Sequence, residues 1–69
     1  MERTKVDSTS IAEIGYDEDS QTLEIEFKNG STYQYFDVPK QVFEDLLSAG
    51  SAGAYLAKNV KGQYRFSRT

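Results

Sequence analysis

The strict alternation of apolar and polar side chains over residues 22–27 limits the fold of this chain more than any other feature. Such an alternation is typical of a β-strand that has one face in a core and the other in water. A second alternating segment, residues 31–36, follows the dipeptide Asn29-Gly30. Because Asn-Gly favours a tight turn between antiparallel strands, the two segments predict a β-hairpin at the centre of the fold.

The register of this hairpin follows from the positions of its apolar side chains. A two-residue loop would mix polar and apolar side chains on both faces of the hairpin. A three-residue loop, Lys28 to Gly30 with Gly30 in the left-handed conformation, keeps the faces separate. This loop pairs Ile25 with Tyr33 and Leu23 with Tyr35, and leaves Glu24, Glu26, Thr32 and Gln34 on the wet face. We expect Tyr33 and Tyr35 to pack in the core, with their hydroxyl groups at its rim. The alternative is that both tyrosines are exposed and form a binding surface on which bases stack.

The rest of the chain predicts one strand before the hairpin, and two helices and a strand after it. Residues 1–10 are polar, and we expect a lead-in with at most a short edge strand around Val6. Residues 11–16 alternate, with Ala12, Ile14 and Tyr16 as the apolar positions. An apolar stripe predicts a helix over residues 39–49 that begins at Pro39 and stops at Gly50. A second helix, capped by Ser51, is expected to reach Asn59, and residues 63–67 alternate around Tyr64 and Phe66 as a last strand.

This order of elements, β-β-β-α-α-β, predicts an α+β domain. We expect an antiparallel β-meander with two short helices packed on one face and a C-terminal strand. A chain of 69 residues has room for one small core, so residues 1–69 are expected to form a single domain.

The chain contains no cysteine and no histidine, which excludes the commonest nucleophile, general base and metal ligands. Asp17, Asp19 and Gln21 have the spacing that begins a calcium loop, but the glycine and glutamate that complete such a loop are missing. Glu24 and Glu26 fit solvated acids better than a catalytic pair. We therefore expect no enzyme, no cofactor and no metal. Since no apolar run approaches the roughly 20 residues that span a bilayer, a cytoplasmic location without membrane contact is expected.

Charge is distributed unevenly along the chain. Residues 1–37 carry nine acids and three bases, whereas residues 46–69 carry four bases and no acid. Basic residues interleaved with aromatic residues suit a single-stranded nucleic acid, because bases stack on rings while cations neutralise phosphates. The candidate residues for nucleic-acid binding are Lys58, Lys61, Arg65, Arg68, Tyr55 and Tyr64. The alternative interpretation is an ordinary solvated face.

Ser51 and Gly53 form a candidate phosphate pocket, because free N–H groups at the start of a helix bind anions. The alternative is that Ser51 only caps its helix and that Gly53 only allows close packing.

Several short motifs resemble those of one family. They are Ile14-Gly15-Tyr16-Asp17, Leu23-Glu24-Ile25-Glu26-Phe27, Gly30, Tyr33-Gln34-Tyr35, Val38-Pro39 and Ala49-Gly50-Ser51-Ala52-Gly53-Ala54-Tyr55. Together they resemble the KTSC domain, which occurs at the C-terminus of some lysyl-tRNA synthetases and as a small stand-alone bacterial protein. The resemblance covers residues 6–64. It implies a small bacterial protein of unestablished function, with RNA binding suggested by the attachment to a tRNA-charging enzyme.

Two functional hypotheses follow. The first is an RNA-binding module for tRNA or single-stranded RNA. The alternative is a protein-interaction or assembly module without catalytic activity, in which a protein partner or a second copy docks on the last strand or a sheet edge. They differ in their response to salt, since about four phosphate contacts predict a slope near −3 for log K against log[salt].

Overall fold

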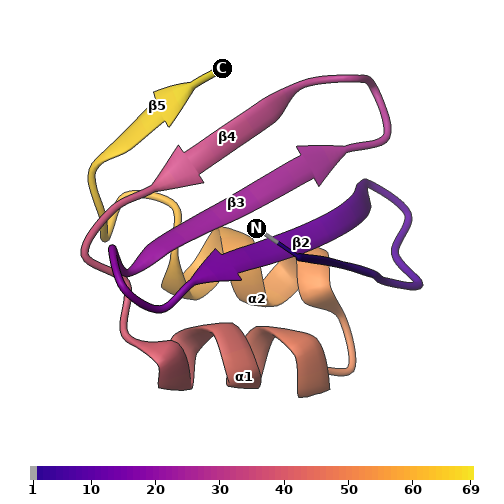
Figure 1. Ribbon diagram of the computed structural model, residues 1–69. Coiled ribbons are helices and arrows are strands. Elements are labelled where there is room, and N and C mark those ends of the chain that lie inside the picture. The colour runs from indigo at the N-terminus through magenta and orange to yellow at the C-terminus, as the bar shows by residue number, and fades with distance from the viewer. Residues whose placement is uncertain (1) are drawn as a thin grey trace.

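The computed structural model describes residues 2–69 as a five-stranded antiparallel sheet with two helices on one of its faces (Figure 1). The elements are β1 (Arg3–Lys5), β2 (Ile11–Asp17), β3 (Thr22–Phe27), β4 (Thr32–Tyr35), α1 (Lys40–Ser48), α2 (Ala52–Asn59) and β5 (Phe66–Arg68). The strand order in the sheet is β1-β2-β3-β4-β5. The predicted α+β meander is confirmed, while Met1, part of the predicted lead-in, lies outside the described residues.

The hairpin of β3 and β4 has the predicted three-residue loop and register. Leu23 pairs with Tyr35, and Ile25 pairs with Tyr33. The amide of Phe27 donates to the carbonyl of Ser31 at 2.8 Å, which closes the loop. Gly30 has a φ of +94°, in the left-handed region that favours glycine. The parity of the apolar side chains therefore predicts the register correctly.

The predicted alternation of β2 is wrong at its start. A β-bulge lies between Ile11 and Glu13, so that Ile11 pairs with Phe27 while Ile14 pairs with Ile25. Because a bulge inserts one extra residue on a strand, Ile11 and Ile14 both face the core although they are three positions apart. Both side chains are fully buried, and Ala12 is only half-buried.

The ends of three other elements differ from the predictions. The N-terminal edge strand lies before Val6, where β1 pairs with β2. Helix α1 begins at Lys40, and Pro39 occupies the cap position with a φ of −65°. The last strand begins at Phe66 because residues 60–63 form a turn, in which the amide of Gln63 donates to the carbonyl of Val60 at 3.0 Å. This turn leaves Tyr64 before the strand rather than in it.

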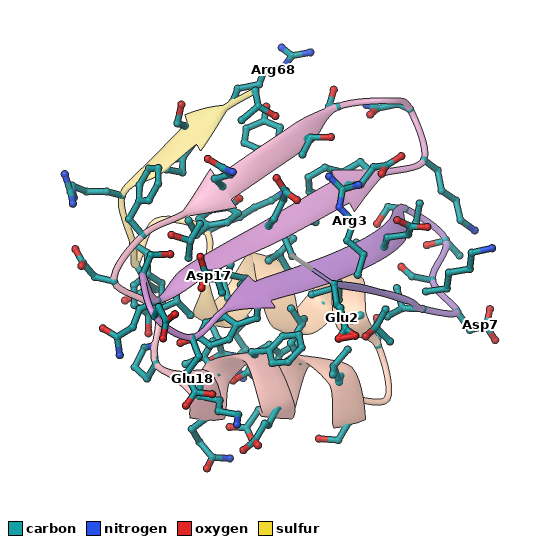
Figure 2. All side chains as sticks on the ribbon, in the orientation of Figure 1. Glu2, Arg3, Asp7, Asp17, Glu18 and Arg68 are labelled. Carbon is teal, nitrogen blue, oxygen red and sulfur yellow. The ribbon has the colours of Figure 1, made fainter. Side chains whose placement is uncertain are left out.

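The face of the sheet opposite the helices is acidic and is crossed by Arg3 (Figure 2). Arg3 on β1 and Glu24 on β3 are both cross-strand partners of Gly15, which has no side chain between them. The guanidinium of Arg3 forms ion pairs with the carboxylates of Glu24 at 2.8 Å, Glu13 at 3.7 Å and Glu26. Its hydrogen bond to Glu24 is the main cause that raises the pKa of Arg3.

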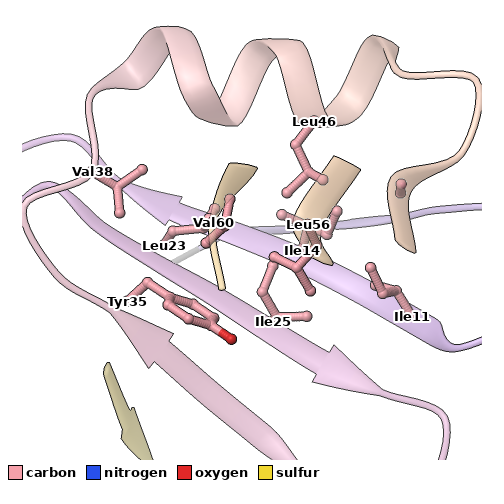
Figure 3. Close-up of a cluster of buried hydrophobic side chains, with 10 residues drawn as sticks. Ile11, Ile14, Leu23, Ile25, Tyr35, Val38, Leu46, Leu56 and Val60 are labelled. Atoms are coloured by element: carbon pink, nitrogen blue, oxygen red, sulfur yellow. The ribbon is translucent and has the colours of Figure 1, made fainter. Parts of the chain in front are cut away.

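The core lies between the helices and the sheet (Figure 3). Its fully or nearly fully buried members come from every layer: Ile11, Ile14, Leu23, Ile25, Tyr35, Val38, Leu46, Ala52, Leu56 and Val60. The prediction that Tyr35 packs in the core is confirmed, whereas Tyr33, two positions earlier, is only half-buried. The helices therefore bury the central strands more completely than the β4 and β5 side of the same face.

Candidate functional site

The β4 and β5 side of the helix-facing surface carries aromatic side chains that the helices do not cover. Phe66 pairs with Tyr35 across the two strands, and Arg68 pairs with Tyr33. Side chains of paired residues lie on the same face of a sheet, so all four belong to the face that holds the core. Phe66 is nevertheless 58% exposed, which makes it one of the two large hydrophobic residues on the surface of the described chain.

These aromatic rings line a pocket of about 450 Å³. Tyr33 is at its centre: its ring centroid lies 5.6 Å from that of Phe27, 6.5 Å from that of Tyr35 and 5.7 Å from that of Phe66. The Phe27 and Tyr33 rings meet edge to face at 88°, and the Tyr33 and Tyr35 rings are stacked at 20°. The lining residues are Phe27, Asn29, Ser31, Tyr33, Tyr35, Lys61, Gly62 and Phe66. The pocket thus has an aromatic surface with polar groups from the β3–β4 turn.

Two cations lie over rings of this pocket. The Nζ atom of Lys61 lies 5.5 Å from the centroid of the Phe27 ring, and the Cζ atom of Arg68 lies 5.9 Å from that of Tyr33. Arg68 also donates from Nη2 to Ser31 Oγ at 3.1 Å. Within residues 2–69, no carboxylate forms a salt bridge with either cation. Both charges therefore stay available to an anionic ligand.

A second, shallower pocket adjoins the first and shares Gly62 and Phe66 with it. Its wall contains Tyr64 and Arg65, two of the candidate residues. The Arg65 guanidinium lies 3.3 Å from the carboxylate of Asp37, but both side chains are more than three-quarters exposed. An ion pair this exposed contributes little free energy, so Arg65 can exchange Asp37 for another anion at small cost.

Tyr55 and Lys58, both on α2, do not line the aromatic pocket. Tyr55 is half-buried, and burial followed by the nearby Asp45 carboxylate raises the pKa of its phenol. Lys58 is exposed in the last turn of the helix. The structure therefore places Lys61 in the lining of the aromatic pocket and Arg68 over the ring of Tyr33. Tyr64 and Arg65 line the neighbouring pocket, and Tyr55 and Lys58 line neither.

The Ser51 and Gly53 pair serves the local structure of α2. The predicted cap is confirmed, since Ser51 Oγ accepts a hydrogen bond from the amide of Ala54 at 3.2 Å. A Cβ atom on Gly53 would lie 3.2 Å from Ser10 Oγ, so this glycine permits the loop before β2 to approach the helix. The observed geometry agrees with the capping and packing alternative, and phosphate binding here stays a prediction.

The predicted nucleic-acid-binding residues do not include most of the residues that line the pocket: Phe27, Asn29, Ser31, Tyr33 and Phe66. The hairpin register already places Phe27 and Tyr33 on one face, which could have indicated that they are neighbours. The position of Phe66 beside Tyr35 could not be predicted, because it depends on the turn at residues 60–63 and on the pairing of β5. Tyr33, for which the sequence leaves core and binding surface open, is half-buried and lines the pocket.

No group of three or more acidic side chains able to hold a metal ion occurs among the residues that the structure describes. None of the helices between residues 2 and 69 is long and apolar enough to cross a membrane.

Comparisons with known proteins point to one family. The model of the KTSC domain matches residues 7–64. A lysine–tRNA ligase of Nostoc punctiforme is 42% identical over 64 residues, which cover 93% of this chain but only 11% of that enzyme. An uncharacterized protein of Stutzerimonas stutzeri is 41% identical, over 99% of this chain and 97% of its own length. The crystal structure of a KTSC domain protein from Yersinia pestis aligns with a TM-score of 0.92 at 38% identity, covering 99% of this chain and 96% of that one.

Proposed function

The chain belongs to the KTSC domain family, and from that premise we propose that it is a non-catalytic module that binds single-stranded RNA in the cytoplasm. The proposed site is the aromatic pocket of Phe27, Tyr33 and Phe66 with Lys61 and Arg68 over its rings.

The observation that supports RNA most strongly is the combination of one exposed ring, that of Phe66, with two cations that form no salt bridge in the described residues. An unpaired base has two apolar faces that stack on an aromatic side chain, and each such contact contributes about 1–3 kcal/mol. The 58% exposure of Phe66 leaves its ring available for such a contact. Lys61 and Arg68, which lie over the rings of Phe27 and Tyr33, supply positive charge for the phosphates of the bound strand.

The acidic outer face limits the surface on which RNA is expected to bind. The carboxylates around Arg3 would repel a phosphate backbone, so RNA is expected only on the β4 and β5 side of the helix-facing surface. A net charge of −3 does not oppose this, because local charge rather than net charge decides where an anion binds.

The relatives add independent support. Three lysine–tRNA ligases contain a segment that is 41–42% identical to this chain. The chain spans only 11% of their length, so the ligation reaction itself is not part of the proposal. A small domain attached to an enzyme that handles tRNA would serve it by contacting RNA, and the stand-alone chain would use the same surface.

Fluorescence anisotropy with a labelled single-stranded RNA tests the proposal. Phe66→Ala removes a stacking ring and Lys61→Ala removes a phosphate contact, and each is expected to weaken binding about tenfold or more. Leu47→Ala and Lys5→Ala are matched controls, because they remove an exposed hydrophobic residue and an exposed cation elsewhere. Absence of binding by the wild-type chain at about 50 mM salt, or equal losses in the controls, would contradict RNA binding at this pocket.

The salt dependence is a second readout. Lys61, Arg65 and Arg68 provide three cations at the two adjoining pockets, which predicts a slope near −2 for log K against log[salt] at about 0.7 per phosphate. This value replaces the slope near −3 expected when Lys58 is counted.

One observation favours the alternative function, a module that assembles with a second copy. Strand β5 is an edge of the sheet and its three residues are all exposed, so its outer side can accept another strand. Sedimentation velocity without RNA tests this alternative. Arg68→Pro removes an amide of β5 that faces away from β4, and Arg68→Ala is its control. A dimer that Arg68→Pro abolishes and Arg68→Ala keeps would support assembly, and a monomer at all concentrations would exclude it.

A further inference from the structure

Three side chains that line the aromatic pocket, Asn29, Ser31 and Lys61, offer hydrogen-bond donors to a base. Asn29 Oδ1 accepts a hydrogen bond from the amide of Ser31 at 2.9 Å. This bond engages the oxygen of the side-chain amide in the turn, and the Nδ2 group keeps two hydrogens to donate. Asn29 therefore offers a donor at the rim of the pocket.

Ser31 and the two cations, Lys61 and Arg68, can also donate hydrogen bonds. Ser31 Oγ accepts from Arg68 Nη2 at 3.1 Å, which leaves the hydroxyl hydrogen of Ser31 to donate. Lys61 can only donate, and Arg68 can only donate. The hydroxyl groups of Tyr33 and Tyr35 can donate or accept, so they do not favour either kind of partner.

We infer that the pocket selects a base whose edge offers carbonyl oxygens, as the O2 and O4 atoms of uracil do, over a base with an amino group at the same position. This inference rests on the proposed RNA binding and adds the class of base. Cytosine has the same ring size as uracil but carries a donating amino group at position 4. An amino group that faces Asn29 Nδ2 and Ser31 Oγ–H would leave donors opposed to a donor, which costs binding free energy.

Oligouridylate and oligocytidylate of equal length test the inference, because stacking area and phosphate number are matched. At neutral pH the wild-type chain is expected to bind oligouridylate about five- to tenfold more tightly. Equal binding of the two RNAs would overturn the inference and leave the proposed function intact. Binding of neither RNA would overturn both.

Asn29→Asp tests the residue that carries the inference. The aspartate keeps an oxygen to accept from the Ser31 amide, so the turn is retained, but it replaces the free donor with an acceptor. The added negative charge is expected to weaken the binding of both RNAs by the same factor. The ratio of their affinities is expected to fall to about one, because the donor that distinguishes them is gone. Asn59→Asp adds the same charge at an exposed position outside the pocket and is expected to keep the ratio.

Ser31→Ala provides a second variant that leaves the turn amide in place. It removes the hydroxyl donor together with the acceptor of the Arg68 hydrogen bond, and the ratio is expected to decrease by about half or more. A wild-type ratio in both Asn29→Asp and Ser31→Ala would show that these donors do not recognise the base and would overturn the inference.

Discussion

Arg3 shows how one side chain organises a surface of this molecule. Its guanidinium crosses β2 at Gly15 and contacts the carboxylates of Glu13, Glu24 and Glu26, which the sheet register places close together. Exposed single ion pairs contribute little, but one cation shared by three acids also relieves the repulsion among them. Arg3 therefore anchors the edge strand β1 on the sheet, while its acids keep the outer face negative.

Arg3→Ala is expected to lower the free energy of unfolding by about 1 kcal/mol at low salt, because three carboxylates lose their shared counter-charge. Urea unfolding followed by circular dichroism measures this change. The loss is expected to shrink in about 1 M salt, where charges are screened within about 3 Å. Lys5→Ala, on the same strand, is the control and is expected to stay within about 0.5 kcal/mol of the wild type. Equal effects of the two variants would argue against the proposed role of Arg3.

Among the elements, the β3–β4 hairpin contributes residues to both the core and the proposed site. Its left-handed Gly30 sets the three-residue loop, the loop sets the register, and the register puts Tyr35 into the core and Tyr33 into the pocket. The same loop contributes Asn29 to the pocket rim. A change in this turn is therefore expected to affect stability and binding together.

Gly30→Ala and Gly50→Ala form a matched pair that tests the turn. A Cβ atom at either position meets no atom within 4 Å, but only Gly30 has a positive φ, of +94°. Gly30→Ala is expected to destabilise the chain by about 1–2 kcal/mol, because the left-handed conformation is strained for alanine. Gly50→Ala is expected to change stability by less than about 0.5 kcal/mol. Thermal unfolding of both variants measures the difference, and similar values would contradict the role of Gly30.

The elements also show why some features could be predicted and others could not. The hairpin register depends on side-chain parity over a few residues, and the α2 cap depends on Ser51 alone, so both were accessible from the sequence. The bulge in β2 and the late start of β5 depend on pairing between distant segments. Ile11 pairs with Phe27, and Phe66 pairs with Tyr35. The pocket is formed by that long-range pairing, and this is why the candidate residues included Lys61 and Arg68 but missed Phe27 and Phe66.

At the scale of the whole molecule, the sheet separates two electrostatic environments. One face carries the acids around Arg3, and the far edge of the other carries the rings with Lys61 and Arg68. The chain has no histidine and no cysteine, so no side chain with an ordinary pKa between 6 and 9 couples this arrangement to pH. Above neutral pH, titration begins to matter where the tyrosines ionise.

The free energy of unfolding is expected to be nearly constant from pH 6 to 9 and to fall above about pH 10. Burial raises the pKa of Tyr35 and of Tyr16 in the folded chain. A folded pKa above the unfolded one contributes stability that is complete below the unfolded pKa and is lost as the pH rises through the folded pKa. Urea unfolding across this range measures the profile, and a marked loss between pH 7 and 9 would contradict it.

Single-stranded RNA is proposed to bind in the pocket between the β3–β4 turn and β5. An NMR titration of isotope-labelled protein with an oligouridylate RNA is the decisive test, because it reports every amide at once. We predict shifts confined to residues around Phe27, Asn29, Tyr33, Lys61 and Phe66, which weaken as salt rises. No shifts at low salt, or shifts centred on the acidic face around Arg3, would contradict RNA binding at this pocket.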